Sequence, residues 1–179
     1  MAPRSDASAD NGVKPTGRPF VITRVFNAPR DLVWKAWTEA EHLQHWWGPK
    51  GCQLDVLKLD LRPGGIFHYA MRFSARAQMM GRFKYLEISP PQRLVYLSSF
   101  ADETSAVIPA PFPGNFPLEV ENTVTFEEHD GKTTLTIHGL PHNASDEQRV
   151  FFEGMFASME GGFGGTCEQL SVYLERLRG

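Results

Sequence analysis

Histidine is the residue type in this sequence best suited to chemistry near neutral pH, because its ordinary pKa lies close to that range. His42 and His45 stand three positions apart in a stretch with helical features, so both imidazoles would share one helix face and could hold a metal ion. Zinc sites need three or four ligands, and no second pair of acids or cysteines stands at ligand spacing. This favours two exposed histidines and no metal. His138 closes a predicted strand, where it could act as a general base toward a cavity, but we favour a packed or surface histidine.

Nucleophilic and anion-binding side chains give weaker indications. Cys52 and Cys167 have no histidine at an informative spacing, and the sequence lacks the G-x-S-x-G nucleophile elbow. Arg24 and Arg72 fall within predicted strands, where either could neutralise a ligand carboxylate, although we expect both to point to solvent. The run Gly161–Gly165 does not match G-x-G-x-x-G and follows no strand, and no P-loop is present. We therefore assign no catalytic residue, expect no cofactor, and leave open whether the protein is an enzyme.

Length and composition indicate one globular domain. The 179 residues are 41% hydrophobic and 22% charged, which is enough for one filled core and short for two. A net charge of -3 excludes a dedicated nucleic-acid binder and a polybasic membrane surface. No apolar run is long enough to span a membrane, and the two distant cysteines cannot form a disulfide framework. We expect residues 1–18 to be a disordered tail without a secretory signal, residues 19–179 to form the domain, and the protein to be cytoplasmic.

Strand and turn patterns dominate the first three quarters of the domain. A β-branched and aromatic run predicts a first strand over 20–26, and Pro29 then starts a helix. A capping box at 38–41 predicts a second short helix that ends at Trp47. Asp130-Gly131 is typical of a tight hairpin, and residues 101–117 form a long, proline-rich loop. The strands expected in this region are 54–61, 66–73, 82–88, 94–100, 119–128 and 132–138.

The last segment is predicted to be one helix of about 30 residues with an apolar stripe. Ser145 begins a capping box at its start, and arginines near its end suit the helix dipole. The glycines of Gly161–Gly165 interrupt it, at about 1 kcal/mol each relative to alanine. Two explanations remain open: close approach of a ligand or a kink that opens a cavity, and close packing of the helix on the sheet.

This order of elements, with its residues, resembles the helix-grip fold of the START/Bet v 1-like superfamily, also called SRPBCC. The closer resemblance is to the branch named after the C-terminal domain of the heat-shock protein 90 ATPase activator. It covers about residues 20 to 177, and Phe163 stands where that branch usually has tryptophan. The motifs that carry it are Arg24-x-Phe26-x-Ala28-Pro29, Val33-Trp34-x-Ala36-Trp37, Leu43-x-x-Trp46-Trp47-Gly48-Pro49, Asp60-x-Arg62-Pro63-Gly64-Gly65, Gly81-x-x-x-Tyr85-x-Glu87-Ile88, Pro91-x-Arg93-Leu94, Thr123-Val124-Thr125-Phe126 and Gly162-Phe163-Gly164-Gly165-Thr166.

The resemblance implies an α+β helix-grip fold of order β-α-α-β-β-β-β-β-β-α, with a curved antiparallel sheet wrapped around the C-terminal helix and an apolar cavity between them. A solid core is the alternative to a cavity. The residues expected to contact a ligand there are Trp46, Trp47, Phe67, Tyr69, Met71, Tyr85, Tyr96, His138, Met155, Met159 and Phe163.

Three functions follow from the resemblance. The first is binding of a small hydrophobic or amphipathic ligand of the lipid, polyketide or aromatic type, with the loop at 101–117 as a lid. The second is a polyketide cyclase or hydrolase that uses His138 or an inward tyrosine as the acid or base. The third is a chaperone-associated module, an analogy at the level of the fold alone. A monomer and a homodimer both remain open.

Overall fold

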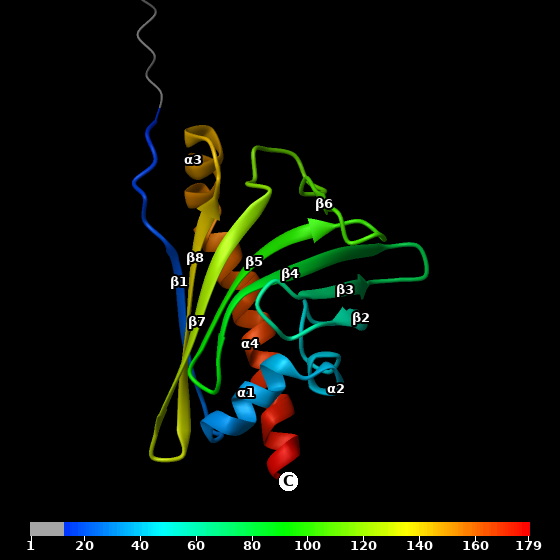
Figure 1. Cartoon of the computed structure of the whole chain (residues 1–179), viewed down its shortest axis with the longest axis vertical. Helices are drawn as coiled ribbons and strands as arrows, with labels where there is room; N and C mark the ends of the chain where they lie inside the picture. The colour runs from blue at the N-terminus through cyan, green and yellow to red at the C-terminus, as the bar shows by residue number, and fades with distance from the viewer. Residues whose placement is uncertain (1–12) are drawn as a thin grey trace, which may run out of the picture.

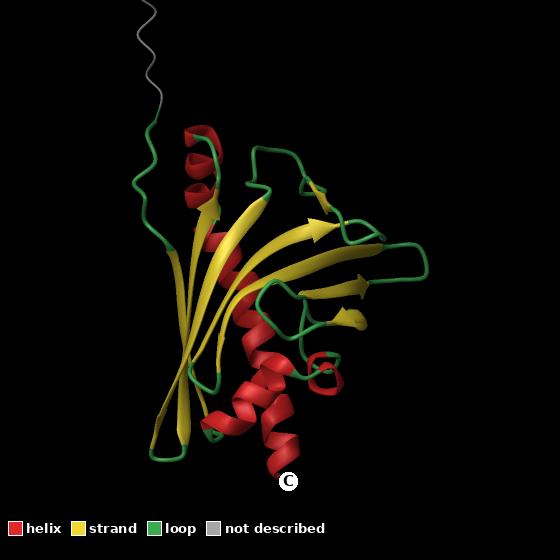
Figure 2. Ribbon diagram, in the orientation of Figure 1, coloured by secondary structure: helices red, strands yellow, loops and turns green. Residues whose placement is uncertain are grey.

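One antiparallel sheet and one long helix dominate the computed structural model, which describes residues 13–179. The strands follow the spatial order β1-β8-β7-β5-β4-β3-β2, and the short β6 pairs with β5. The sheet is strongly bent, with α4 running along it and α1 and α2 closing one end (Figures 1 and 2). This is the predicted α+β helix-grip fold. The strands are β1 (Phe20–Phe26), β2 (Gln53–Leu59), β3 (Ile66–Arg72), β4 (Gln78–Ser89), β5 (Arg93–Ala101), β6 (Val107–Ile108), β7 (Glu119–His129) and β8 (Lys132–His142).

The helices are α1 (Arg30–Thr38), α2 (Ala40–Leu43), α3 (Asp146–Gly154) and α4 (Phe156–Arg178). The predicted capping box at Thr38 is wrong. Thr38 is the last residue of α1, and its hydroxyl donates to the Trp34 carbonyl at 2.8 Å, so its side chain is not free to cap α2. The predicted capping box at Ser145 is confirmed, because its hydroxyl accepts from the Gln148 amide and the Gln148 side chain accepts from the Ser145 amide.

The C-terminal helix differs from the prediction in where it breaks. The structure divides it at Met155, which joins α3 to α4, whereas the glycines of 161–165 are helical throughout. The loop at 101–117 contains the two-residue strand β6, which had not been expected. The hairpin at Asp130-Gly131 is confirmed: both residues have positive φ angles, 51° and 74°, as the tightest hairpin turns require.

The N-terminal residues of the described part contact the helices. The amides of Thr16 and Gly17 donate to the carboxylate of Glu153 on α3, and the Arg18 guanidinium lies over the Phe156 ring. Residues 1–12 of the predicted tail lie outside the described residues.

Alternation along the strands separates the two faces of the sheet. On β7 and β8 the inner residues are buried and the residues between them are exposed or half-buried. The core on the inner face is dense with aromatic rings at the end closed by α1 and α2. Trp37 contacts Trp46 with ring centroids 5.1 Å apart, and Phe83 stacks on Tyr96 at 3.9 Å. This end of the inner face is filled by side chains.

Candidate functional site

A cavity of about 320 Å³ lies between the inner face of the sheet and α4, at the end away from α1. Strands β3, β4, β5 and β7 form its floor, α4 forms its wall, and the turn after α2 and the loop after β6 complete it. Its size falls within the range of small-molecule sites. The residues that line it are Trp47, Gly48, Pro49, Tyr69, Met71, Met79, Gly81, Ser98, Ser99, Phe100, Phe116, Val120, Asn122, Met159, Gly162, Phe163 and Thr166.

The structure brings together five residues of the predicted ligand-binding set at this cavity: Trp47, Tyr69, Met71, Met159 and Phe163. They come from the turn after α2, from alternate positions of β3, and from one face of α4. These elements are far apart in sequence, so only the fold places the five side chains around one space.

The structure puts four other predicted residues in the filled part of the core. Trp46, Phe67, Tyr85 and Tyr96 are each at most 2% exposed, and they pack against other rings without reaching the cavity. Met155 does not line the cavity either, because it joins α3 to α4.

His138 lies outside the cavity, contrary to the sequence-based expectation that it could reach one. Its neighbours Ile137 and Gly139 on β8 face inward and are buried, so alternation directs His138 to the outer face, where it is exposed. It therefore cannot act as an acid or base on a ligand in this cavity.

Sequence reasoning missed the polar residues Ser98 and Asn122, which line the cavity. Gly162, an exposed helical residue at its border, belongs to the glycine run for which close approach of a ligand was one of the two explanations. A usable sequence indication existed, since Ser98 follows the inward Tyr96 by two positions and Asn122 precedes the inward Val124 by two.

The glycines of α4 leave open space rather than close packing. A side chain at Gly161, Gly162 or Gly165 would meet no other group within 4 Å. Only a side chain at Gly164 would have a neighbour, the Arg24 guanidinium at 3.4 Å. The structure thus disfavours close helix–sheet packing as the reason for these glycines, and of the four only Gly162 borders the cavity.

Hydroxyl and amide groups supply the polarity of the cavity, and no described residue that lines it carries a formal charge. Burial raises the pKa of Tyr69 to about 12, and a hydrogen bond from the Trp47 side chain opposes the rise. Burial also raises the pKa of the Cys167 thiol to about 11 against the opposing charge of Arg24, so this thiol is protonated at neutral pH. These groups can donate and accept hydrogen bonds, but none is poised to gain or lose a proton at neutral pH.

The two arginines considered for a ligand carboxylate take different positions. Arg24 is half-buried on the inner face of the edge strand β1, where it donates to the Thr23 carbonyl and does not line the cavity. Arg72 lies at the end of β3 and forms an ion pair with Asp55 at 2.7 Å.

Both histidines of the predicted pair are engaged by one tyrosine. The Nδ1 atom of His42 lies 2.6 Å from the Tyr173 hydroxyl, and the His45 ring stacks on the Tyr173 ring. The side chains of Glu39, Glu41 and His42 do approach within 4.8 Å of one another at the surface. Exposed groups of this kind are common without an ion, so the cluster by itself gives no reason to assign a metal site.

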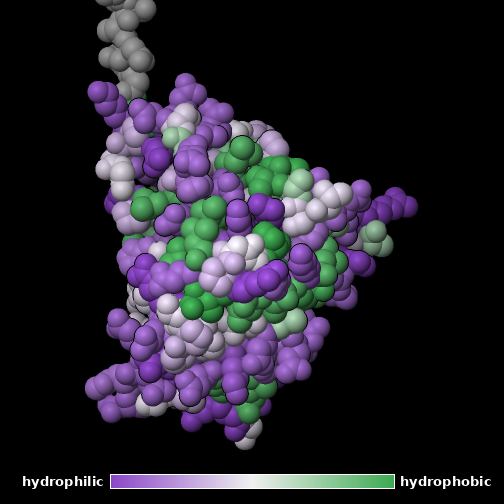
Figure 3. All heavy atoms as spheres, in the orientation of Figure 1, coloured by the Kyte–Doolittle hydropathy of each residue, from purple (hydrophilic) through white to green (hydrophobic). Residues whose placement is uncertain are grey.

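Hydrophobic atoms reach the surface in a band across the middle of the molecule and beside the loop that carries β6 (Figure 3). That loop contributes Phe116 to the cavity, and Phe116 contacts Phe100 and Phe112 with centroids 6.5 and 5.5 Å apart. A second hollow of about 350 Å³ lies on the far side of Phe100 and Met79, against Asp102 and Glu103 of the same loop. The loop thus forms part of the boundary of both spaces.

A bent antiparallel sheet that holds a long C-terminal helix, with an apolar cavity between them, defines a helix-grip protein of the SRPBCC superfamily. Residues 27–175 match the family described as activator of Hsp90 ATPase homolog 1-like protein, so this chain belongs to that family. Members of the family bind hydrophobic ligands or act as cyclases.

Solved structures agree with this placement. Protein Ms6760 from Mycobacterium smegmatis has a TM-score of 0.71 at 28% identity, over 88% of this chain and 91% of the other. A protein from Arthrobacter aurescens has a TM-score of 0.75 at 26% identity, over 89% and 87%. DynU16, from the dynemicin biosynthetic locus, shares the fold with a TM-score of 0.60 at 19% identity, over 88% and 47%. No curated protein matched the chain. Among residues 13–179, no helix combines the length and hydrophobicity that a membrane crossing requires.

Proposed function

We propose that this protein binds a small hydrophobic or amphipathic molecule in the cavity between the sheet and α4. The observation that carries the proposal is a cavity of about 320 Å³ whose walls are mostly aromatic rings, methionines and glycines. Aromatic walls provide a large apolar contact area, and methionine side chains adapt to ligands of different shape. The loop at 101–117 acts as the lid, because it holds Phe116 against the cavity.

Two adjacent glycines provide a matched test. Gly162 borders the cavity, whereas Gly161 does not, and both are exposed helical residues with no neighbour within 4 Å of an added Cβ. We expect the G162L variant to lose binding of an environment-sensitive dye such as N-phenylnaphthylamine at least tenfold, as roughly one leucine side chain enters the cavity. The G161L variant should bind the dye as the native protein does.

Fluorescence titration with all three proteins decides the question, with circular dichroism as the check on folding. Equal dye affinity in the native protein and the G162L variant would remove the cavity as the binding site. An absence of binding to the native protein would remove the proposed function altogether.

A cyclase-like enzyme is the second candidate, and one observation favours it. The cavity is not lined by carbon alone, since Tyr69, Ser98 and Asn122 place hydroxyl and amide groups in it. Such groups can stabilise negative charge that develops on a substrate oxygen, although no described lining residue can serve as a general base at neutral pH. Turnover of bound ligand, followed by mass spectrometry, would distinguish this candidate from binding alone.

A further inference from the structure

A buried amide marks one end of the cavity. Asn122 lies on the inner face of β7, between Val120 and Val124, and is 5% exposed. Its Nδ2 atom donates to the Ser98 hydroxyl at 2.8 Å and to the Val120 carbonyl at 3.0 Å. A carbonyl can only accept, so this contact fixes which side of the amide is nitrogen.

The other side of this amide is an acceptor without a protein donor. Asn122 pairs with Gly139 across the strands, and a side chain at Gly139 would place its Cβ 3.4 Å from Asn122 Oδ1. Within residues 13–179 no group donates to Oδ1. The inner face of β7 otherwise carries Val120, Val124 and Phe126, and Oδ1 is not among the fully buried atoms that lack a partner, so it opens onto the cavity. Since Asn122 also lines the cavity, a hydrogen-bond donor on a ligand would pair with Oδ1.

Tyr69 marks the opposite end. Its hydroxyl lies over Gly81, where a Cβ would come within 2.5 Å of it, so the ring leans from β3 across β4. The Trp47 side chain lowers the pKa of this phenol as a hydrogen-bond donor would, and an indole can only donate. Among residues 13–179 the Tyr69 hydroxyl donates to no acceptor within hydrogen-bond distance, so its proton is available to a ligand.

The separation between these ends follows from the sheet. The Tyr69 hydroxyl stands over β4, and Asn122 lies on β7, two strands away in the order β4-β5-β7. Gly81 and Asn122 pair with positions four residues apart on β5, Phe100 and Tyr96. Two strand spacings of about 4.8 Å and four residues of about 3.3 Å each place the backbones beneath the two polar groups about 16 Å apart, and a hydrogen bond of about 2.8 Å at each end leaves about 10 Å for a ligand. This is the length of a compound with two or three fused rings.

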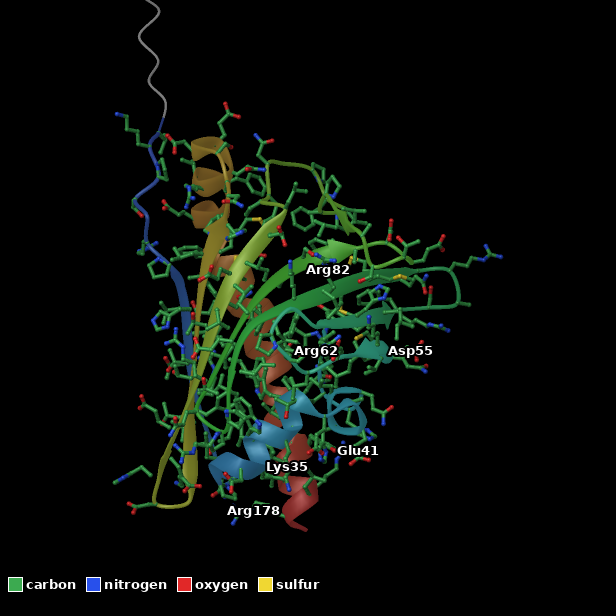
Figure 4. All side chains as sticks on the ribbon, viewed as in Figure 1. Lys35, Glu41, Asp55, Arg62, Arg82 and Arg178 are labelled. Carbon is green, nitrogen blue, oxygen red and sulfur yellow. The ribbon has the colours of Figure 1, made fainter. Side chains whose placement is uncertain are left out.

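No charged side chain of the described residues lines this space, and the nearest cation noted on the inner face is Arg24, beside Gly164 of α4, which donates to the Thr23 carbonyl. The labelled Asp55, Arg62 and Arg82 belong to the strands and turns of the sheet, and Lys35, Glu41 and Arg178 to the helical end (Figure 4). Arg82 alternates with the inward Gly81 and Phe83 and donates to the Ser105 carbonyl at 2.8 Å. A ligand carboxylate in the cavity would lose its water without gaining a cationic partner among the lining residues, which disfavours it.

We propose, on the basis of the proposed function, that the cavity selects an uncharged ring compound with a hydrogen-bond donor toward Asn122 and an oxygen acceptor toward Tyr69. Hydroxylated aromatic ketones belong to this class. Carboxylic acids, including fatty acids, do not bind as anions.

Dye displacement at neutral pH with a matched set of probes tests the proposal. Naphthol presents a donor, methoxynaphthalene has the same rings without the donor, and naphthoate carries a charge. In the native protein we expect naphthol to bind about threefold to tenfold more tightly than methoxynaphthalene, and naphthoate at least about a hundredfold more weakly than naphthol. Acetylnaphthol, with its two oxygens at opposite ends, should gain a further threefold to tenfold over naphthol.

Variants assign each preference to its residue. In the N122V variant naphthol and methoxynaphthalene should bind equally, because position 122 no longer accepts a hydrogen bond from naphthol. The S98A variant, which releases one anchor of the amide, should reduce the naphthol preference if N122V does not fold. The Y69F variant should lose the acetylnaphthol gain and keep the naphthol preference.

The outcomes separate the two proposals. Dye binding without a naphthol preference in the native protein, or with naphthoate bound as tightly as naphthol, overturns this inference and leaves the proposed function standing. A naphthol preference that persists unchanged in both N122V and S98A also overturns it. If the dye itself does not bind, the proposed function fails and this inference fails with it.

Discussion

Replacing two glycines of α4 by alanine should stabilise this protein. Gly161 and Gly165 are helical, and an added Cβ at either position would meet no group within 4 Å. Alanine is favoured over glycine in a helix interior by about 1 kcal/mol, because glycine loses more backbone entropy on folding. The double variant G161A/G165A should therefore gain about 2 kcal/mol in free energy of unfolding. For a domain of this length, that gain raises the melting temperature by about 4–8 °C.

Urea denaturation measures the gain, with an unchanged m-value as the sign that the denatured state is the same. The G164A variant is the matched control, because its Cβ would contact the Arg24 guanidinium at 3.4 Å and should gain less. Neither Gly161 nor Gly165 lines the cavity, so dye affinity should stay at the native value in the double variant. A loss of stability in G161A/G165A would mean that the glycines do pack closely against the sheet, which would refute this reading of α4.

Three further perturbations have expected outcomes. G81A would place a Cβ 2.5 Å from the Tyr69 hydroxyl, so the free energy of unfolding measured by urea denaturation should fall by about 1–3 kcal/mol from overpacking. Dye binding should weaken as well, because the Tyr69 ring moves into the cavity. Native stability and native dye affinity in G81A would contradict this. Hydrogen bonds from the Thr16 and Gly17 amides hold the pKa of Glu153 below its ordinary value of 4.5, so the contact is stable above that pH and is lost as pH falls through the lower, native pKa. The protection factors of the Thr16 and Gly17 amides, which correct for the intrinsic pH dependence of exchange, should fall over that range, and in E153Q they should already be lower at neutral pH. Equal protection factors in both proteins would count against the contact. Burial raises the pKa of Tyr69, Tyr85 and Tyr96 from the ordinary value near 10, so their contribution to stability is complete below about pH 10 and is lost as pH rises toward the native values. An alkaline absorbance titration should show these phenols ionising together with unfolding, and ionisation in the folded protein near pH 10 would contradict it.

The strands of this fold were predictable because their patterns are local. Alternation and turn residues placed each long strand to within a few residues, and Asp130-Gly131 fixed the β7–β8 hairpin. The elements that sequence reasoning missed depend on tertiary contacts. The two-residue β6 forms only because Phe100 and Ala101 offer it a partner, and the start of β4 at Gln78 lacks alternation.

The break in the C-terminal helix shows the same limit. Glycines predict weakness in a helix, yet α4 runs unbroken through Gly161–Gly165 and the chain breaks at Met155. Helix propensity contributes little to the stability of a helix, and packing along the rest of this 23-residue helix outweighs it. The break therefore follows from where α3 and α4 pack and could not be located from composition.

The sequence predicts on which face of the sheet a site residue lies, but not whether that residue reaches the cavity. Leu135 and Ile137 fix the inner face of β8, so His138 falls on the outer face, and this pattern was available in the sequence. Phe67 and Tyr69, in contrast, share the inner face of β3, and only Tyr69 reaches the cavity. Distinguishing them requires the position of α4 over the sheet, which alternation does not determine.

A gradient of side-chain size along the inner face explains why the cavity lies where it does. Toward α1, the inner positions of the strands carry large residues that fill the space beneath α4. Toward β6, the same strands carry small or polar residues: Gly81 on β4, Ser98 on β5, Asn122 on β7 and Gly139 on β8, with Gly162 opposite on α4. The cross-strand register staggers these positions diagonally across the sheet, because Gly81 pairs with Phe100, Ser98 with Phe83, and Asn122 with Tyr96 and Gly139. Interiors are otherwise packed to crystal density, so a diagonal of small or polar residues beneath α4 leaves a volume that neighbouring side chains do not fill. The large residues stabilise the fold, and the small ones leave the space in which we propose that a ligand binds.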